Sequence, residues 1–326
     1  MVKVKKFGIV VIGRNEGLRL KTCLESIINY TKYIVYVDSG STDDSINIAQ
    51  NLHVEIIKLD MSVPFTAARA RNVGFQKLIE IDPDLEFVQF VDGDCEVMSD
   101  WLDTALSYLS KHSTVAVVCG RRRERYPHNS KYNLLCDIEW NTKPGEIKSC
   151  GGDAMYRTDA FRTVNGFRQN LIAGEEPELC FRLRNTGWHI WRLDTEMTLH
   201  DANLMHFSQW WKRSIRGGYA FAEGAFLHGK KSERYRVRET MRIWLWGISL
   251  PIIIASLSLQ NIWWLLLLIA YPIQILRIFI KGEYSTRHNM IYATFLMLAK
   301  FPEGIGQLKF IINRVFGRQN KIIEYK

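Results

Sequence analysis

The sequence lacks any Cys-x-x-Cys pair, although it contains six cysteines. They are scattered along the 326 residues, at Cys23, Cys95, Cys119, Cys136, Cys150 and Cys180. In a chain of this length, such spacing predicts free thiols in a reducing compartment rather than a disulfide framework. The first residues lead directly into a short apolar run and lack the long apolar core and small-residue cleavage site of a signal peptide. Both absences favour a cytosolic setting.

Several nucleotide and nucleic-acid motifs are also missing. No Gly-x-Gly-x-x-Gly follows the first apolar run and no Walker A sequence occurs, which argues against a dinucleotide fingerprint and a P-loop. There is no zinc-finger spacing, no RNA-binding aromatic signature and no basic helix typical of a groove reader. We therefore expect no nucleic acid partner.

Positive charge is present but unevenly distributed. The net charge is +9, and the residues from 241 onward contain ten Lys or Arg against three acids. Seven of the nine net charges therefore lie in an apolar, basic tail, and the preceding 240 residues are nearly neutral. This pattern favours contact with an anionic membrane surface.

Short apolar runs rich in β-branched and aromatic residues alternate with segments of helical periodicity. The predicted strands are residues 7–12, 33–37, 54–59, 87–91 and 115–118, and the predicted helices between them include 18–29, 67–78 and 101–109. This alternation predicts an α/β fold, with a mostly parallel sheet and helices on both faces. We place this domain at residues 1–230 and a membrane-associated region at residues 231–326.

The run Phe87–Asp94 ends in two carboxylates, Asp92 and Asp94, separated by one glycine. A parallel strand that ends there would present both acids at the edge where open α/β sheets bind ligands. Carboxylate oxygens suit a hard divalent cation, and such a cation suits a diphosphate. Asp and Gly are also common in solvated turns, so this motif taken alone has a structural alternative.

Three further segments carry polar side chains suited to a nucleotide. Asn15 and Glu16 follow the first strand, Asp38 ends the second, and Arg71 lies in the helix after the third. Asp38 could bind a base or ribose and Arg71 a phosphate. Each also has a structural alternative, because Asp38 could form an Asx-turn, Glu16 could stabilise a helix N-terminus and Arg71 could be solvated. The arginine-rich run 121–125 is interpreted either as a solvated charge run or as a contact to phosphate or an anionic acceptor.

A second set of acids follows in the middle of the chain. Gly152 precedes Asp153, and its lack of a side chain allows close approach of a ligand to the backbone. Glu175, Glu176 and Glu178 flank Pro177 at a predicted helix start, where capping alone explains acids and where one could also act as a general base.

A third metal ligand is still missing from these segments. His200 follows a predicted strand at 189–193, and we take it as the candidate. A lone histidine is more often structural than a ligand.

Two nearly uninterrupted apolar runs, 243–259 and 262–276, are separated by a short turn with no charge. Each is near the lower length limit for a membrane-spanning helix, about 17 residues. Basic residues flank both outer ends, which by the positive-inside rule places both ends in the cytoplasm. We predict a membrane hairpin over about 243–280 and an amphipathic segment over about 290–316; a buried core hairpin is the alternative. The aromatic, basic run 209–213 could stack on a sugar or anchor the chain at a membrane.

Taken together, the chain resembles glycosyltransferase family 2 of the GT-A fold over about residues 5–230. The likeness rests on the order of six motifs: Val10–Glu16, Val37–Asp43, Ala70–Gly74, Asp92–Asp94, Gly151–Asp153 and Gly174–Leu179. The resemblance implies a nucleotide-sugar donor, with UDP-sugar expected, and an inverting transfer assisted by Mg²⁺ or Mn²⁺.

The resemblance also implies roles for individual residues. Asp38 would contact the nucleoside, Asp92 the ribose or the metal shell, and Asp94 and His200 the metal. Glu176 falls where the family has its catalytic base, usually an aspartate. Because Glu is one methylene longer, the base stays open among Glu176, Glu175 and Asp153. The Gln-x-x-Arg-Trp motif of processive members is absent around Gln209.

The sequence thus predicts a membrane-attached glycosyltransferase that faces the cytoplasm. The hairpin favours a lipid-linked or glycolipid acceptor in envelope polysaccharide synthesis, and the C-terminal region could form oligomers. One alternative is a catalytically decayed membrane protein that binds nucleotides or glycans. The other is a sugar nucleotidyltransferase, although its Gly-rich, Lys-containing N-terminal loop is absent.

Overall fold

The computed structural model describes residues 6–318, so the outermost ends of both predicted domains lie outside it. The chain forms two compact units. The first comprises residues up to 126, 139–171 and 175–203, and the second comprises residues 127–138, 172–174 and 204 onward. Residues 204–230 therefore lie in the second unit, whereas the sequence prediction placed them in the α/β domain, with the boundary at residue 230.

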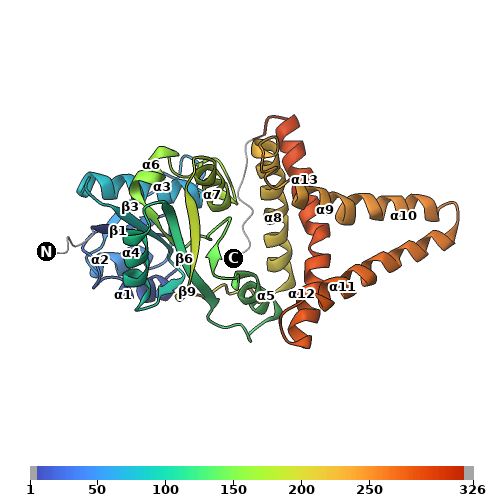
Figure 1. Ribbon diagram of the computed structural model, residues 1–326, viewed down its shortest axis with the longest axis horizontal. Coiled ribbons are helices and arrows are strands. Elements are labelled where there is room, and N and C mark those ends of the chain that lie inside the picture. Colours follow the sequence, from blue (N-terminus) through green and yellow to red (C-terminus); the bar gives the residue numbers. More distant parts are fainter. Residues whose placement is uncertain (1–5, 319–326) are drawn as a thin grey trace. The chain divides into compact units, whose positions relative to one another are not determined.

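The first unit is an α/β structure built on one mixed sheet (Figure 1). Its strands are β1 Phe7–Gly13, β2 Ile34–Asp38, β3 Glu55–Lys58, β4 Phe87–Asp92, β5 Cys95–Val97, β6 Val115–Glu124, β7 Gly145–Glu146, β8 Ala154–Arg157 and β9 His189–His200. The order is β3-β2-β1-β4-β8-β6-β9-β5, and β7 pairs with β9. The pairs among β1 to β4 are parallel, as expected, whereas β8 runs antiparallel to both β4 and β6.

The helices of this unit are α1 Leu18–Glu25, α2 Ser45–Asn51, α3 Ala67–Ile81, α4 Trp101–Lys111, α6 Thr158–Thr163 and α7 Glu175–Asn185, with α5 Lys131–Trp140 ending in it. They cover both faces of the sheet. Successive strand residues point to opposite faces, so neighbouring residues of one strand contact helices on opposite sides. Phe90 packs on Phe161 of α6, with ring centroids 5.4 Å apart. The neighbouring Gln89 accepts a hydrogen bond from the Trp101 indole of α4 on the opposite face. The predicted α/β fold is confirmed.

Two strands extend well beyond their predicted lengths. The sequence predicted strands at 115–118 and 189–193, but β6 continues to Glu124 and β9 to His200. The two run parallel along most of this length, with irregularities in register. The arginine-rich run therefore lies in the sheet, because a paired neighbour satisfies its backbone hydrogen bonds. Gly120 allows this pairing, since a Cβ there would lie 2.5 Å from the Thr195 carbonyl oxygen.

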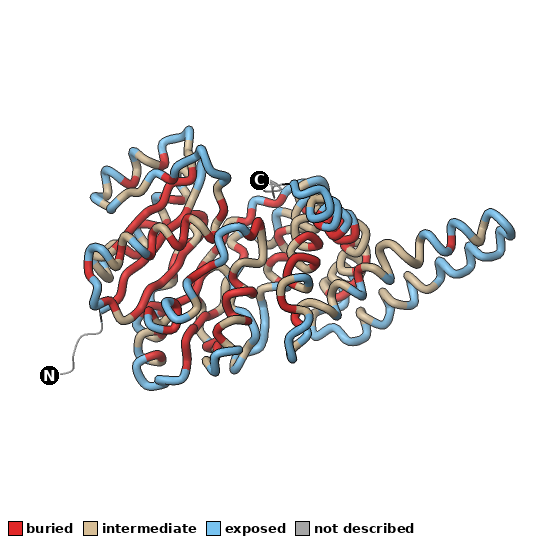
Figure 2. Tube along the Cα trace, turned by 90° about the horizontal axis from the view of Figure 1, so that it is seen from above, coloured by how far each residue is buried: buried red, intermediate tan, exposed pale blue. Residues whose placement is uncertain are grey.

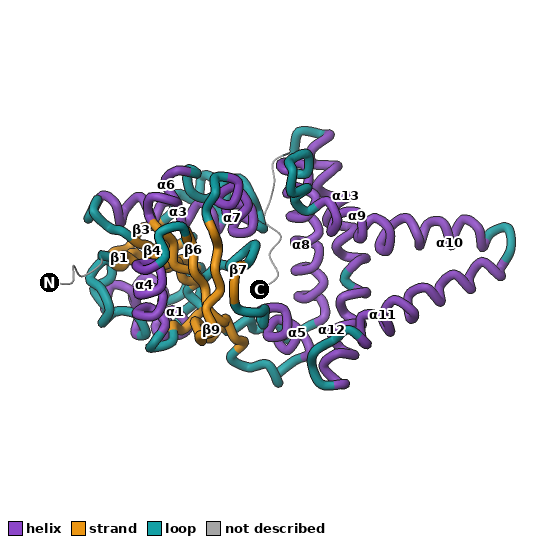
Figure 3. The backbone as a smooth tube through the Cα atoms, viewed as in Figure 1, coloured by secondary structure: helices purple, strands orange, loops and turns teal. Residues whose placement is uncertain are grey.

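The second unit is helical over its described residues (Figure 3). Its elements are the first part of α5, then α8 Phe207–His228, α9 Val237–Ile243, a π-helical turn Trp244–Ser249, α10 Leu250–Ser258, a 3₁₀ helix Ile262–Ile269, α11 Ala270–Ile280, α12 Thr286–Leu298 and α13 Lys300–Val315. Small residues let α8 and α13 approach closely. A Cβ on Gly218 would lie 2.0 Å from the Glu303 carbonyl oxygen, and one on Gly306 would lie 2.0 Å from that of Ile215.

The predicted hairpin is present as two apolar arms, Val237–Ser258 and Ile262–Ile280. Both are long and apolar enough to cross a membrane, by length and composition. Their most apolar windows are only 11% and 0% buried, and Figure 2 shows these arms almost free of buried residues. The alternative of a buried core hairpin therefore does not hold within the described residues.

Candidate active site

The carboxyl ends of β1, β2 and β4 meet at one edge of the sheet. Strand register places Gly13 beside Asp38 and Ile12 beside Asp92. The segments that follow these strands therefore gather where open α/β sheets bind ligands. The structure thus brings together the polar residues that the sequence located at three separate strand ends.

Asp38 and Asn15 organise the loops at this edge. The Asp38 carboxylate accepts hydrogen bonds from the backbone N–H groups of Gly40 and Ser41, at 3.0 and 2.9 Å, and from the Tyr36 hydroxyl at 2.9 Å. Asn15, in a left-handed conformation with φ of 57°, accepts a hydrogen bond from the backbone N–H of Thr42 at 2.7 Å. These contacts match the Asx-turn alternative for Asp38, and they fix the loop between β2 and α2.

Glu16 lies beside the same loops. Its carboxylate forms an ion pair with Arg19 of the following helix, at 2.8 Å. Its backbone N–H donates to the Ser45 hydroxyl at 3.1 Å, which ties the end of β1 to the start of α2.

Asp92 ends β4 between two arginines. Its Oδ1 lies 2.6 Å from Arg71 Nη2, and its Oδ2 lies 2.9 Å from Arg122 Nη2. Burial by itself would raise the pKa of Asp92, but the two guanidinium groups outweigh it and hold that pKa below its ordinary value. Arg71 is itself only 2% exposed and reaches Glu175 Oε1 at 2.8 Å. The solvated alternative for Arg71 is therefore wrong.

Arg122 was not predicted from the sequence as an individual site residue. It pairs with Asp153 Oδ2 at 2.6 Å as well as with Asp92, and Thr198 donates to the same Asp153 oxygen at 2.9 Å. The Asp153 Oδ1 atom accepts a hydrogen bond from the Asp92 backbone N–H at 2.9 Å. The alternation of side chains along a strand could have indicated Arg122. Arg122 and Glu124 share one face of β6, while Arg123 lies on the other and is exposed.

Gly152 lies directly against this ion-pair network. A Cβ at this position would lie 2.9 Å from both Arg71 Nη2 and Asp92 Oδ2. The groups that approach the backbone at this glycine are therefore charged side chains of the protein, Arg71 and Asp92. Any larger residue would displace the Arg71–Asp92 pair.

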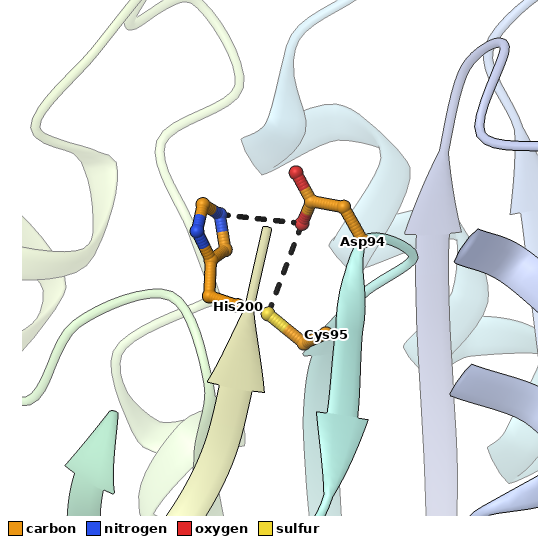
Figure 4. Close-up of side chains that lie close together, drawn as sticks. All are labelled: Asp94, Cys95 and His200. Carbon is orange, nitrogen blue, oxygen red and sulfur yellow. Dashed lines mark hydrogen bonds and ion pairs between the residues drawn. The ribbon is translucent and has the colours of Figure 1, made fainter. Parts of the chain in front are cut away.

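Asp94 and His200 come together across two strands (Figure 4). Antiparallel pairing of β5 with β9 places Cys95 opposite His200, so Asp94 lies beside the imidazole. His200 Nε2 is 3.3 Å from Asp94 Oδ1, and its Nδ1 is 3.7 Å from Glu124 Oε2. Burial disfavours the imidazolium, but Asp94 and Glu124 outweigh it and raise the pKa of His200 above 6.5.

The donor atoms of this pair fit a divalent cation. Asp94, Cys95 and His200 each offer one ligand atom, all within 4.8 Å of one another. A carboxylate and an imidazole suit Mn²⁺ or Mg²⁺ better than the neutral thiol does, since burial raises the pKa of Cys95. Asp92 falls in a different group, with Cys95 and Asp153. In the structure Asp94 therefore pairs with His200, whereas Asp92 pairs with Arg71 and Arg122.

The adjacent acids at the start of α7 point to different partners. Glu175 binds Arg71, whereas Glu176 Oε1 accepts a hydrogen bond from the Cys150 backbone N–H at 2.6 Å. The thiols of Cys150 and Cys180 donate to the same oxygen, at 3.1 and 3.0 Å. Glu176 is 5% exposed. Neither cysteine had a role predicted from the sequence, because the two positions are 30 residues apart in the chain.

Comparison with known protein families gives a match that lies largely in the first unit. The sequence profile described as Glycosyl transferase family 2 matches residues 8–164. The chain is 27% identical over 201 residues to the succinoglycan biosynthesis protein ExoA of Rhizobium meliloti, covering 57% of this chain and 60% of that protein. It is 23% identical over 205 residues to the O-antigen chain rhamnosyltransferase RfbN of Salmonella typhimurium, covering 57% and 63%. The matched regions thus span less than two thirds of these relatives.

Solved structures with the same fold cover more of the chain. A mannosyltransferase from Pyrobaculum calidifontis, in complex with GDP-Man and Mn²⁺, superimposes with a TM-score of 0.64 at 16% identity, over 94% of this chain and 88% of the other. TarS of S. aureus in complex with UDP-GlcNAc gives a TM-score of 0.52 at 14% identity, over 96% and 92%. At these identities the likeness is one of fold.

Proposed function

We propose that this chain, which matches glycosyl transferase family 2 over residues 8–164, transfers a sugar from a nucleoside-diphosphate donor to an acceptor hydroxyl, with inversion at the anomeric carbon. The observation that carries the proposal is the Asp94–His200 pair, whose atoms lie 3.3 Å apart beside the edge where β1, β2 and β4 end. Family relatives named for succinoglycan and O-antigen synthesis support a role in polysaccharide or O-antigen biosynthesis.

Asp94 and His200 would hold the divalent cation, Mn²⁺ or Mg²⁺. When bound, the ion would neutralise negative charge on the diphosphate leaving group. The cation requires neutral His200, whose proton is stabilised by Asp94 while no metal is present. Asp92 is proposed to face the donor ribose from between Arg71 and Arg122.

The donor is proposed to lie along the same edge, against Asn15, Glu16, Asp38, Arg71, Gly152 and Asp153. Asn15 and Asp38 shape the loop between β2 and α2, so their part in donor binding is partly to fix that loop. We expect a UDP-sugar. GDP is the alternative to include, because the mannosyltransferase structure contains GDP-Man and the TarS structure UDP-GlcNAc.

Glu176 is proposed as the base that takes the proton of the acceptor hydroxyl as that oxygen attacks the anomeric carbon. Displacement from the face opposite the leaving group inverts the centre, as in inverting glycosidases with the acceptor in place of water. The three hydrogen bonds that Glu176 Oε1 accepts hold the carboxylate at the start of α7 and leave its second oxygen for the acceptor. Glu175 and Asp153 are more strongly engaged as partners of arginines.

The test is thermal unfolding with UDP, GDP, dTDP or CMP, each with and without Mn²⁺. A nucleotide present at about 100 times its dissociation constant stabilises the folded state by about 2.7 kcal/mol. We expect stabilisation by one diphosphate that depends on Mn²⁺ and is lost in Asp94→Asn. A response to none of the four nucleotides would contradict the proposal and favour a decayed site. Binding of a donor sugar without turnover would favour the same alternative, and formation of a nucleotide sugar from a triphosphate would favour a nucleotidyltransferase.

The acceptor is proposed to be lipid-linked or a glycolipid at the cytoplasmic face of the membrane. The exposed apolar arms Val237–Ser258 and Ile262–Ile280 support this, as do Arg242, Arg277 and Lys281 at their outer ends.

Extraction of membranes with alkaline carbonate should leave the chain in the pellet, and replacing Trp263 and Trp264 by Arg should release it. Release of the unaltered chain would contradict membrane insertion. Self-association through this region is a further expectation, checked by light scattering in detergent.

A further inference from the structure

A second group of metal-ligating side chains lies apart from the Asp94–His200 pair. Cys150 precedes the Gly151–Asp153 segment, and Cys180 lies one turn along α7 from Glu176. The Cys150 and Cys180 sulfur atoms are 3.6 Å apart, and each lies 3.1 Å or less from Glu176 Oε1. We propose that Cys150, Cys180 and Glu176 form a binding site for a thiophilic divalent cation such as Zn²⁺ or Cd²⁺.

The triangle of ligand atoms has the dimensions of one face of a tetrahedral site. With Zn–S near 2.3 Å and Zn–O near 2.0 Å, tetrahedral angles separate two sulfurs by about 3.8 Å and a sulfur from an oxygen by about 3.5 Å. The observed sulfur–sulfur separation is 3.6 Å and the sulfur–oxygen separations are 3.1 and 3.0 Å. Entry of an ion therefore needs each thiol to move from the carboxylate by about half an ångström. Small side-chain rotations supply such a shift.

Charge also balances at this site. Burial raises the pKa of both thiols, so in the metal-free protein they are neutral donors to the Glu176 carboxylate. Binding of a divalent cation expels two protons, one from each thiol. The cluster then holds one cation of charge +2, two thiolates and one carboxylate, and its net charge stays at −1. No uncompensated charge is created in the buried site.

Access and a supporting contact come from the Cys150 side. Cys180 is buried, but Cys150 is partly exposed, which gives an ion and a coordinating water a route in. The Tyr156 hydroxyl lies 3.3 Å from the Cys150 sulfur and can donate to the thiolate once the thiol proton has left. Such contacts orient ligands and strengthen metal binding.

The ligand set separates this site from the Asp94–His200 pair. Two thiolates select a soft or borderline ion, whereas a carboxylate with an imidazole accepts Mn²⁺ or Mg²⁺. If Glu176 is the base, which rests on the proposed function, an ion bound here would occupy its carboxylate and stop transfer. The binding site itself needs no catalytic role for Glu176.

The test is a titration of the full-length protein with Cd²⁺ at saturating Mg²⁺, followed by the thiolate-to-metal charge-transfer absorbance. We expect one ion bound with two thiolates. In Cys150→Ser the absorbance per bound ion should fall by about half and the affinity by at least about tenfold. Cys180→Ala should behave alike. Circular dichroism and thermal unfolding establish that each variant is folded.

Matched controls use the other cysteines. Cys136→Ser, in the helical unit, and Cys95→Ser, which removes the thiol beside His200, should leave the two-thiolate signal intact. An unchanged signal in folded Cys150→Ser, or its loss in Cys95→Ser, would overturn the proposal. Because the readout is absorbance, the test of the binding site does not depend on turnover. If Cd²⁺ binds with two thiolates but does not slow transfer, the site stands and the role of Glu176 as base fails.

Discussion

The buried Arg71 and the partly buried Asp92 form an ion pair, with Nη2 and Oδ1 2.6 Å apart, that joins helix α3 to the end of strand β4. The other terminal nitrogen of Arg71 holds Glu175 at the start of α7. One guanidinium thus fixes the spacing of three elements around the candidate site. Gly152 leaves the room for this arrangement, because a Cβ there would lie 2.9 Å from Arg71 Nη2.

Replacement of Arg71 should be strongly destabilising. In Arg71→Met we expect a loss of about 3 to 5 kcal/mol in the free energy of unfolding, because Asp92 and Glu175 keep their charges and lose a buried partner. Urea unfolding at pH 7 measures it. Lys77→Met is the control on the same helix, since Lys77 forms only partly exposed pairs with Glu55 and Glu80, worth less than about 1 kcal/mol. Equal losses in the two variants would contradict the bridging role.

Metal affinity should depend on both members of the Asp94–His200 pair. Asp94→Asn and His200→Gln should each weaken Mn²⁺ binding by at least about tenfold, because each replaces a carboxylate or imidazole ligand by a weaker neutral amide. Electron paramagnetic resonance of free Mn²⁺ measures this in the presence of the stabilising nucleotide. Asp103→Asn, an exposed acid on α4, is the control. If either site variant keeps the full affinity for Mn²⁺, the substituted residue is not a ligand of the metal.

Substitution of the proposed base should separate binding from chemistry. Glu176→Gln keeps an oxygen that can accept the Cys150 N–H, so donor affinity should be retained while turnover falls by about 10² to 10⁴. Glu175→Gln should instead weaken the contact to Arg71 and lower the thermal midpoint. Donor affinity by calorimetry and single-turnover rates distinguish the two. Unchanged turnover in Glu176→Gln would move the base to Glu175, Glu178 or Asp153.

Stability should fall in acid because of Asp92. Its pKa is lowered on folding, so its stabilising contribution is complete above the unfolded value of about 3.9 and is lost as pH falls through the lower folded value. Asp92→Asn should therefore be less stable than the unaltered protein at pH 7. The difference should shrink as the pH is lowered from about 4 toward 2. Urea unfolding over this range in EDTA measures it, and a difference independent of pH would show that Asp92 does not titrate with folding.

Local pattern was sufficient for much of the first unit. The apolar run ending at Asp92 predicted β4, and the helical period from Ala67 predicted α3, because hydrophobic period and strand length depend on neighbouring residues alone. The uncharged apolar runs 243–259 and 262–276 of the hairpin were visible for the same reason. The ends of β6 and β9 were missed, since pairing between distant strands extends them past their apolar cores.

By itself, the sequence determined the α/β alternation, the acids at the strand ends and the likeness to a known family, because each is carried by short motifs of residues close together in the chain. Only the tertiary structure decided which acid meets which partner. Asp92 and Asp94 are two residues apart, yet one binds Arg71 and Arg122 while the other binds His200. Glu175 and Glu176 diverge in the same way, toward an arginine and toward two thiols. Neighbours in sequence point to different surroundings, and the pairing of distant strands and helices sets what each one meets.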